Sequence, residues 1–209
     1  QRQMCIRDSK MTVFAVLMRL REICCDPRLV ADNWTGSSAK LDACLELVTE
    51  AVAGGHRILL FSQFTSMLEL LAKRLDEAGV SHFTLQGSTP KPVRAEQVRR
   101  FNQGEADVFL ISLRAGGTGL NLTAADIVIH YDPWWNLAAQ NQATDRAYRI
   151  GQRNPVQVYR VIAQDTIEEK IVELQQAKQS LADTVTGGAD GAILSMNPEQ
   201  LLQLLGEEA

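Results

Sequence analysis

The sequence predicts an α/β fold in which a parallel sheet carries helices on both faces. Short apolar runs alternate with amphipathic stretches of roughly 10–15 residues, which is the pattern of repeated strand–helix–strand units. The run Arg57–Phe61 is apolar after its first residue, as expected of a strand that is buried on both faces. Parallel strands need crossover connections, so the helices are expected to cover the sheet through right-handed crossovers.

Helices are expected where apolar residues recur every three or four positions. Proline or glycine marks several of their ends: Pro27 follows the first helix, Gly54 the second and Gly79 the third. Ser38 stands directly before the second helix, where its hydroxyl can cap the first turn. The expected helices are Thr12–Ile23, Ala39–Ala53, Ser66–Ala78, Pro92–Asn102, Asn136–Ile150, Ile167–Val185 and Asn197–Leu205.

Strands are expected where short apolar runs stand between turn-forming residues. Most of these runs are separated by one predicted helix, which favours parallel pairing. The glycine-rich segment Gly187–Gly191 follows the last long helix and is expected to be a flexible linker. The expected strands are Arg57–Phe61, Ser81–Leu85, Asp107–Ser112, Ile127–Tyr131 and Val156–Ala163.

The composition is that of a folded domain. Apolar residues make up 45% and charged residues 22% of the 209-residue chain, which excludes a disordered tail, a collagen-like chain and a coiled coil. No apolar run approaches the roughly 18–20 residues of a membrane span, and the N-terminus does not resemble a secretory signal. The four cysteines form no Cys-x-x-Cys pair and no histidine stands at ligand spacing from them, so we expect reduced thiols and no metal site.

Charge is unevenly distributed along the chain. The net charge is −4, and five acidic residues follow Lys178 with no Lys or Arg among them. Because those residues contribute −5, residues 1–178 carry +1, and the stretch 91–160 holds nine basic and six acidic residues. An acidic tail thus masks a mildly basic body, so the negative total does not exclude a nucleic-acid partner.

Three segments that follow predicted strands carry residues of unusual chemistry. Ligands of an open parallel sheet bind beyond the carboxyl ends of its strands, so these segments are expected at one edge. Ser62–Thr65 suits anion contacts through the amides of a helix N-terminus, and its alternative is an ordinary capped helix start. Ser112–Asn121 has three glycines within four residues, where the backbone can approach a ligand, and Arg114, which could hold a phosphate. Its alternative is a structural turn.

The third segment, Gln140–Arg153, contains the helix after the fourth strand. Arg146 and Arg149 stand three positions apart, so their guanidiniums are expected on one helical face, with Gln142 one turn earlier. Two arginines and a glutamine on one stripe can grip a triphosphate. The alternative is a solvated basic face in which Asp145 pairs with Arg149.

Together these motifs resemble those of a known protein family. From Val13 to about Leu205 the chain is similar to the C-terminal RecA-like lobe of the Swi/Snf family of DNA-dependent ATPases, in helicase superfamily two. The most specific matches are Asp132–Asn136 (Asp-Pro-Trp-Trp-Asn) and Gln142–Gln152, which matches the sixth motif of the family. Shorter matches are Arg19–Leu29, Phe61–Thr65, Leu85–Asn102 and Ser112–Thr123.

The resemblance implies four segments in the chain. A RecA-like lobe occupies 39–186, preceded by a helical segment and loop at 11–38 and followed by a linker and terminal helix at 187–209. Residues 1–10 are set aside as an artefactual or disordered N-terminus, because Met4–Ser9 resembles translated sequencing adapter.

The resemblance also implies that ATP, with Mg²⁺, binds between this lobe and a second RecA-like lobe. That N-terminal lobe would supply the phosphate-binding loop and the acidic box that holds most of the metal. This chain contains no Gly-Lys dipeptide and no Asp-Glu-x-His box. We therefore expect half an active site without ATPase activity of its own, whose partner is the N-terminal ATPase lobe of the same polypeptide.

By the same resemblance, Arg149 with Arg146 beside it forms the arginine-finger pair that stabilises charge on the γ-phosphoryl group. Gln142 would help to place these groups. Gly117 and Gly119 would shape the loop that links the nucleotide to DNA.

The macromolecular partner implied is double-stranded DNA, held mainly through its phosphates and without sequence preference. Arg94 is assigned a structural role, and His130 is expected to be a packed strand residue. The candidate DNA contacts are Gln63, Ser88, Lys91, Arg114 and Trp135.

Two functions stay open. In the leading hypothesis the chain is the second motor lobe of an ATP-dependent duplex-DNA translocase of the chromatin-remodeller type. In the alternative it is a stand-alone, non-catalytic nucleic-acid or protein binding module with the same fold, which the intact Arg146 and Arg149 pair disfavours. No membrane partner is expected, and the protein is expected at the nucleoid in a bacterium or in the nucleus of a eukaryote.

Overall fold

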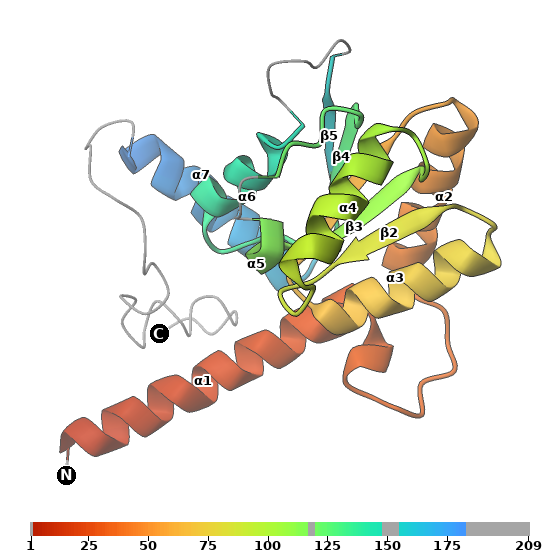
Figure 1. Cartoon of the computed structure of the whole chain (residues 1–209). Helices are drawn as coiled ribbons and strands as arrows, with labels where there is room; N and C mark the ends of the chain where they lie inside the picture. Colours follow the sequence, from red (N-terminus) through yellow and green to blue (C-terminus); the bar gives the residue numbers. More distant parts are fainter. Residues whose placement is uncertain (1, 117–119, 148–154, 183–209) are drawn as a thin grey trace.

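A parallel sheet forms the centre of the molecule. The computed structural model describes residues 2–116, 120–147 and 155–182 (Figure 1). Its five strands lie in the order β2–β3–β1–β4–β5, and every neighbouring pair is parallel. The predicted parallel α/β architecture is therefore confirmed. The strands are β1 (Ile58–Ser62), β2 (His82–Leu85), β3 (Val108–Ser112), β4 (Ile127–His130) and β5 (Gln157–Arg160).

The helices follow the strands in the expected alternation. A 3₁₀ turn, η1 (Pro27–Leu29), follows the first helix. The second helix has the predicted bounds, and Ser38 caps it as predicted, because its Oγ accepts a hydrogen bond from the amide of Leu41. The helices are α1 (Arg2–Cys25), α2 (Ala39–Ala53), α3 (Thr65–Glu77), α4 (Lys91–Asn102), α5 (Leu113–Gly116), α6 (Leu137–Thr144) and α7 (Ile167–Ala182).

Helices α2 and α3 cover one face of the sheet. Val48 of α2 and Leu71 of α3 are fully buried and pack in one cluster with Leu60 and Leu110. The α3 helix ends just before Gly79, whose positive φ of 69° suits glycine and turns the chain toward β2. This layer is the larger part of the hydrophobic core. Burial of its apolar side chains is the main contribution to the free energy that holds the two helices on the sheet.

Helices α4, α5 and α6 cover the other face. Phe101 of α4 and Phe109 of β3 are both fully buried, with ring centroids 5.3 Å apart. Ala115 of α5 and Ala143 of α6 belong to the same cluster. All five residues of β1 are buried, so this central strand is covered from both sides, as its apolar sequence predicted.

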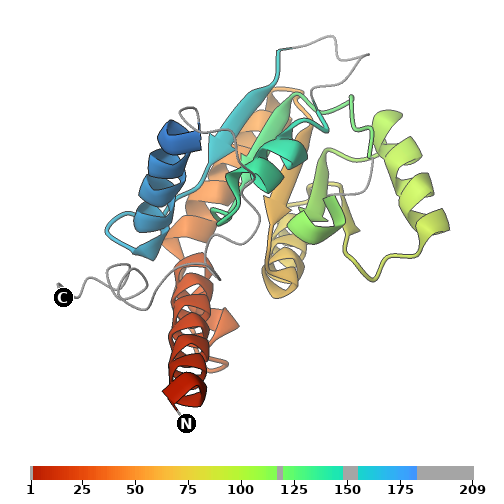
Figure 2. The same cartoon turned by 90° about the vertical axis from the view of Figure 1, so that its left-hand side faces the viewer.

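The second half of α1 packs against the first half of α7 (Figure 2). Leu17 of α1 packs with Ile167 and Ile171 of α7 in a third cluster. The first half of α1 projects away from the body in both views (Figures 1 and 2). This helix begins at Arg2 rather than at the predicted Thr12, because no glycine or proline interrupts the sequence up to Cys25.

The region after β4 differs from the prediction. The expected helix Asn136–Ile150 ends at Thr144, beyond which the amides of Arg146 and Ala147 donate to carbonyls three residues earlier, so the chain forms a turn instead of a further α-helical turn. The four-residue helix α5 was not predicted, and β5 is shorter than the expected run. The predicted linker Gly187–Gly191 and terminal helix Asn197–Leu205 lie outside the described residues.

None of the helices in the described ranges is both long enough and apolar enough to span a membrane.

Candidate functional site

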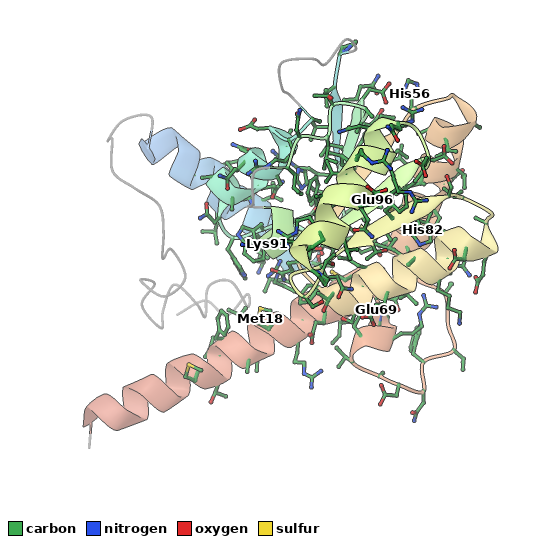
Figure 3. The ribbon with its side chains drawn as sticks, in the orientation of Figure 1. Met18, His56, Glu69, His82, Lys91 and Glu96 are labelled. Atoms are coloured by element: carbon green, nitrogen blue, oxygen red, sulfur yellow. The ribbon has the colours of Figure 1, made fainter. Side chains whose placement is uncertain are left out.

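The carboxyl ends of four strands lie level at one edge of the sheet. Phe61 near the end of β1 is in register with Ile111 of β3 and with His130 of β4, and Leu85 of β2 is also in register with Ile111. The segments after these strands therefore all start at the same edge, as the sequence predicted. Figure 3 shows Lys91 toward this edge and His56, which precedes β1, at the opposite end of the sheet.

A buried carboxylate joins two of these segments. Asp132, two residues past β4, accepts a hydrogen bond from Ser62 Oγ at 2.5 Å on Oδ1. The amide of Gln63 donates to the same carboxylate, at 3.2 Å to Oδ1 and 3.3 Å to Oδ2. Burial raises the pKa of Asp132, and the positive charge of Arg21 opposes that rise. The loop after β1 is thereby fixed to the loop after β4.

The guanidinium of Arg21, from α1, contacts both loops. Its Nη2 lies 3.6 Å from Asp132 Oδ2 and donates to the carbonyl of Pro133 at 2.5 Å. Its central carbon lies 5.5 Å from the ring centroid of Phe64 and 5.1 Å from that of Trp135, both within cation–π range. Burial lowers the pKa of Arg21, and Asp132 partly counters this effect.

A second buried ion pair, formed by Lys40 and Glu168, lies beside Tyr131. Lys40 of α2 donates to both carboxylate oxygens of Glu168 at the start of α7. The Glu168 carboxylate also accepts from the amide of Ala163 at 2.9 Å, and Lys40 Nζ lies 5.0 Å from the ring centroid of Tyr131. This pair fixes α7 to α2, because both charges are removed from water and depend on each other.

Two buried glutamines connect α6 to α7. Gln140 Oε1 accepts from the amide of Trp134 at 3.2 Å, and Gln175 of α7 donates to the carbonyl of Trp134. Both glutamine side chains are buried. The start of α6 is therefore fixed to α7 and to the loop that contains Trp134.

The structure brings the backbone of all five predicted DNA contacts to this edge. Gln63 and Trp135 are half-buried in the two loops joined by Arg21 and Asp132, and their side-chain donors Nε2 and Nε1 have no hydrogen-bond partner among the described residues. Ser88 and Lys91 are exposed, in the turn after β2 and at the start of α4. Arg114 lies in α5, but its side chain is outside the described part.

The predicted nucleotide contacts fall into two groups. Gln142 is exposed on α6, whereas Arg146 is buried in the turn beyond it, so these two residues do not share the expected helical stripe. Arg149, Gly117 and Gly119 lie outside the described residues. The ends of the glycine segment can still be located, because Ala115 and Leu120 pack in one cluster with Ala143 and Ala147. The described residues on either side of the glycine segment therefore pack near the end of α6.

His130 is the packed strand residue that was predicted. It is 1% exposed, stacks on Phe61 with ring centroids 5.5 Å apart, and has Nε2 2.8 Å from Thr144 Oγ1. Burial, and secondarily the charge of Arg160, lowers the pKa of its imidazole to about 4. The described residues include no group of three or more His, Cys, Asp and Glu side chains placed to hold a metal.

Sequence patterns did not identify the residues that hold this edge together. Arg21 had a detectable signal, because it stands four positions from both Leu17 and Cys25 on the buried stripe of α1. Asp132 was noted only as part of a motif, and Lys40 and Glu168 not at all.

Comparison with known proteins defines the class of this fold. Residues 39–151 match the helicase conserved C-terminal domain, and the chain belongs to that family.

Its relatives specify the type of helicase lobe. The chain is 40% identical over 201 residues to the putative ATP-dependent helicase/translocase YwqA of Bacillus subtilis, covering 93% of this chain and 22% of that protein. It is 46% identical over 168 residues to the chromatin-remodeling ATPase INO80 of Aspergillus terreus, covering 79% of this chain and 10% of that protein. An uncharacterized ATP-dependent helicase of Mycoplasma pneumoniae is 39% identical over 94% of this chain, which spans 19% of that relative's length.

A solved structure agrees with this assignment. The C-terminal part of the Fun30 ATPase domain superposes with a TM-score of 0.64 at 33% identity, covering 75% of this chain and 53% of that one. The resemblance to the C-terminal RecA-like lobe of Swi/Snf-type helicases is thereby confirmed. The chain spans about a fifth or less of the length of the relatives named above.

Proposed function

We propose that this chain is the second motor lobe of an ATP-dependent duplex-DNA translocase of the chromatin-remodeller type. The observation that carries the proposal is the convergence of segments from four strand ends at one sheet edge, in a family whose relatives are named as ATP-dependent helicases and remodelling ATPases. The lobe would be incomplete without an N-terminal lobe that carries the Walker A and DExH motifs.

The nucleotide half of the site would use the end of α6 and the glycine segment beside it. We assign the contact with the γ-phosphoryl group to Arg149, where a positive charge stabilises the transition state. Arg146 is buried within this lobe, which favours a part in positioning the segment that carries Arg149. Gln142 is exposed and therefore accessible to a nucleotide held by the other lobe. Gly117 and Gly119 would let the backbone approach it.

The Mg²⁺ that accompanies ATP would be held mainly by the N-terminal lobe. In that arrangement the metal would neutralise charge on the phosphates, and the present lobe would supply Arg149 when the two lobes close. Closure would couple hydrolysis to a step along DNA.

The DNA half would use the loops after β1, β2, β3 and β4. Gln63, Ser88, Lys91, Arg114 and Trp135 would contact mainly phosphates, so binding should not depend on base sequence. The hydrogen bond between Leu122 and Arg146 supports coupling, since it joins the glycine segment to the end of α6.

The test compares ATP hydrolysis by this chain alone with hydrolysis after the chain is joined to an N-terminal ATPase lobe. Duplex DNA should stimulate the joined protein, and the chain alone should be inactive. Turnover by the chain alone would disprove the half-site proposal. A joined protein that neither hydrolyses ATP nor responds to DNA would favour the stand-alone binding module.

A further inference from the structure

Arg21 is buried, and its guanidinium contacts two loops at the edge of the sheet. Apart from Met18 on its own helix, every hydrogen bond, ion pair and ring contact given for it in the described residues falls on the two loops after β1 and β4. The loop after β1 supplies Phe64, and the loop after β4 supplies Pro133 and Trp135. A single side chain of α1 therefore joins both loops.

The ion-pair partner of Arg21 extends this connection. Asp132 lies 3.6 Å from the guanidinium and holds Ser62 and the backbone amide of Gln63. Moving Arg21 would thus disturb the backbone at Gln63 through Asp132. It would also disturb Trp135 directly, because the guanidinium lies over its ring. Gln63 and Trp135 are the two half-buried residues among the candidate DNA contacts whose side chains are described.

We propose that Arg21 is a positioning residue that links α1 to the DNA-contacting loops, holding Gln63 and Trp135 in the arrangement that binds a duplex. This inference rests on the proposed DNA contacts of those two residues. Arg21 itself does not touch DNA in this arrangement; it acts through Asp132, Phe64 and Trp135. Because α1 projects from the body (Figures 1 and 2), a change in its position would reach the loops through Arg21.

The molecule contains its own matched control. The pair formed by Lys40 and Glu168 is buried to a similar degree, with side-chain exposures of 6% and 0% against 1% and 0% for Arg21 and Asp132. Its partners are Tyr131, Cys25 and Ala163, and none of them belongs to the loop segments 62–65 or 133–135. Removing Lys40 thus deletes one buried positive charge that makes no hydrogen bond, ion pair or ring contact with residues 62–65 or 132–135, and that acts on Asp132 only through space.

The experiment measures the affinity of the purified chain for a short fluorescent DNA duplex at low salt, together with resistance to urea. Arg21→Met should weaken binding by about tenfold, the equivalent of one or two lost charge-assisted contacts. Lys40→Met should lower stability while leaving affinity within about twofold, because Lys40 makes no direct contact with Gln63 or Trp135. A twofold change in affinity corresponds to well under the free energy of one contact. Arg21→Lys keeps the charge but not the planar fork, so it should bind nearly as weakly as Arg21→Met.

A spectroscopic readout separates positioning from stability. In a Trp34→Phe/Trp134→Phe background, Trp135 is the single tryptophan, and DNA should quench its emission. Arg21→Met should abolish the quenching, and Lys40→Met should retain it. Should Arg21→Met fail to fold, Arg21→Lys carries the test.

The outcomes distinguish the proposed DNA contacts from the positioning role of Arg21. Failure of the unmodified chain to bind duplex DNA at low salt would overturn the proposed DNA contacts, and the role of Arg21 with them. If the unmodified chain binds duplex DNA, and folded Arg21→Lys and Arg21→Met bind it with the same affinity and the same quenching as the unmodified chain, only the positioning role is overturned. Equal loss of affinity in Lys40→Met would also overturn it, since the effect would then be general.

Discussion

Lys40 Nζ lies 2.5 Å from Oε2 and 2.6 Å from Oε1 of Glu168, a residue 128 positions later in the chain. The pair joins α2, which packs on one face of the sheet, to α7, which packs on α1. Such a contact joins two segments that lie more than half the chain apart in sequence. The pair stabilises the fold only while both residues are present, because either one alone would be a buried charge without a partner.

Lys40→Met should therefore lower the free energy of unfolding by about 3–5 kcal/mol, the usual cost of leaving one member of a buried pair alone. The double variant Lys40→Met/Glu168→Gln should recover part of this loss, because no buried charge remains. Urea denaturation of the purified chain measures both. Arg99→Gln is the control, since its ion pair with Glu96 is exposed and such pairs contribute about 1 kcal/mol or less. Similar losses in Arg99→Gln and Lys40→Met would contradict this account.

His130 should make stability depend on pH. Its folded-state pKa is about 4, lowered mainly by burial, against 6.5 for a free imidazole. The unfolded chain therefore binds more protons between these values, and stability must fall as the pH drops from 6.5 toward 4. We expect a loss of about 2 kcal/mol between pH 7 and pH 5 from this residue.

The measurement is urea denaturation at pH 7 and pH 5 for the natural chain and for His130→Gln. The glutamine variant should be less stable at pH 7, because it loses the stacking on Phe61, but its stability should change less between the two pH values. His56→Gln is the control, since His56 is 44% exposed and lies at the other end of the sheet (Figure 3). An unchanged pH response in His130→Gln would show that other groups dominate.

Local sequence patterns predicted most of the fold, because the elements concerned are set by local signals. The helix Ala39–Ala53 has a capping serine before it and glycine after it, and both signals lie within the segment itself. The central strand Ile58–Ser62 was evident from its apolar run. The end of α6 was not predicted, since no glycine or proline follows Thr144 closely, and the turn that begins there also contacts Leu122, a residue far away in sequence.

The candidate site, too, was only partly predictable from local sequence patterns. Its location followed from a general property of parallel sheets, and the predicted segments after β1 and β3 do start at one edge, whereas the roles of the site residues stay predictions. The connection between Arg21 and Asp132 could not be read from the sequence, because the position of Arg21 on the apolar stripe of α1 indicates burial but does not identify its partner. Their pairing depends on how α1 crosses the sheet edge, which no local pattern specifies.

DNA affinity should fall steeply with salt and be insensitive to base sequence. A contact to phosphate releases counterions, so each one adds about 1 to the slope of log affinity against log salt. Lys91→Ala should weaken binding uniformly and reduce this slope by about 1. Titrations of a fluorescent duplex over a range of salt concentrations measure it. Lys73→Ala, on α3 and exposed, is the matched control and should change neither quantity. A flat salt response in the natural chain would exclude a phosphate-contacting surface.

Arg149→Ala should abolish DNA-stimulated ATP hydrolysis once the chain is joined to an N-terminal ATPase lobe. An arginine that stabilises the transferring phosphoryl group accelerates hydrolysis by about 10³–10⁵-fold, so the loss should be near-complete. Nucleotide affinity should change little, because the proposed contact forms mainly in the transition state and the other lobe holds the phosphates. Steady-state turnover and binding of a fluorescent nucleotide measure the two separately. Arg99→Ala removes an exposed arginine of α4 and should leave both unchanged. Turnover that persists in Arg149→Ala would assign the finger to another residue, and buried Arg146 would then be the first to test.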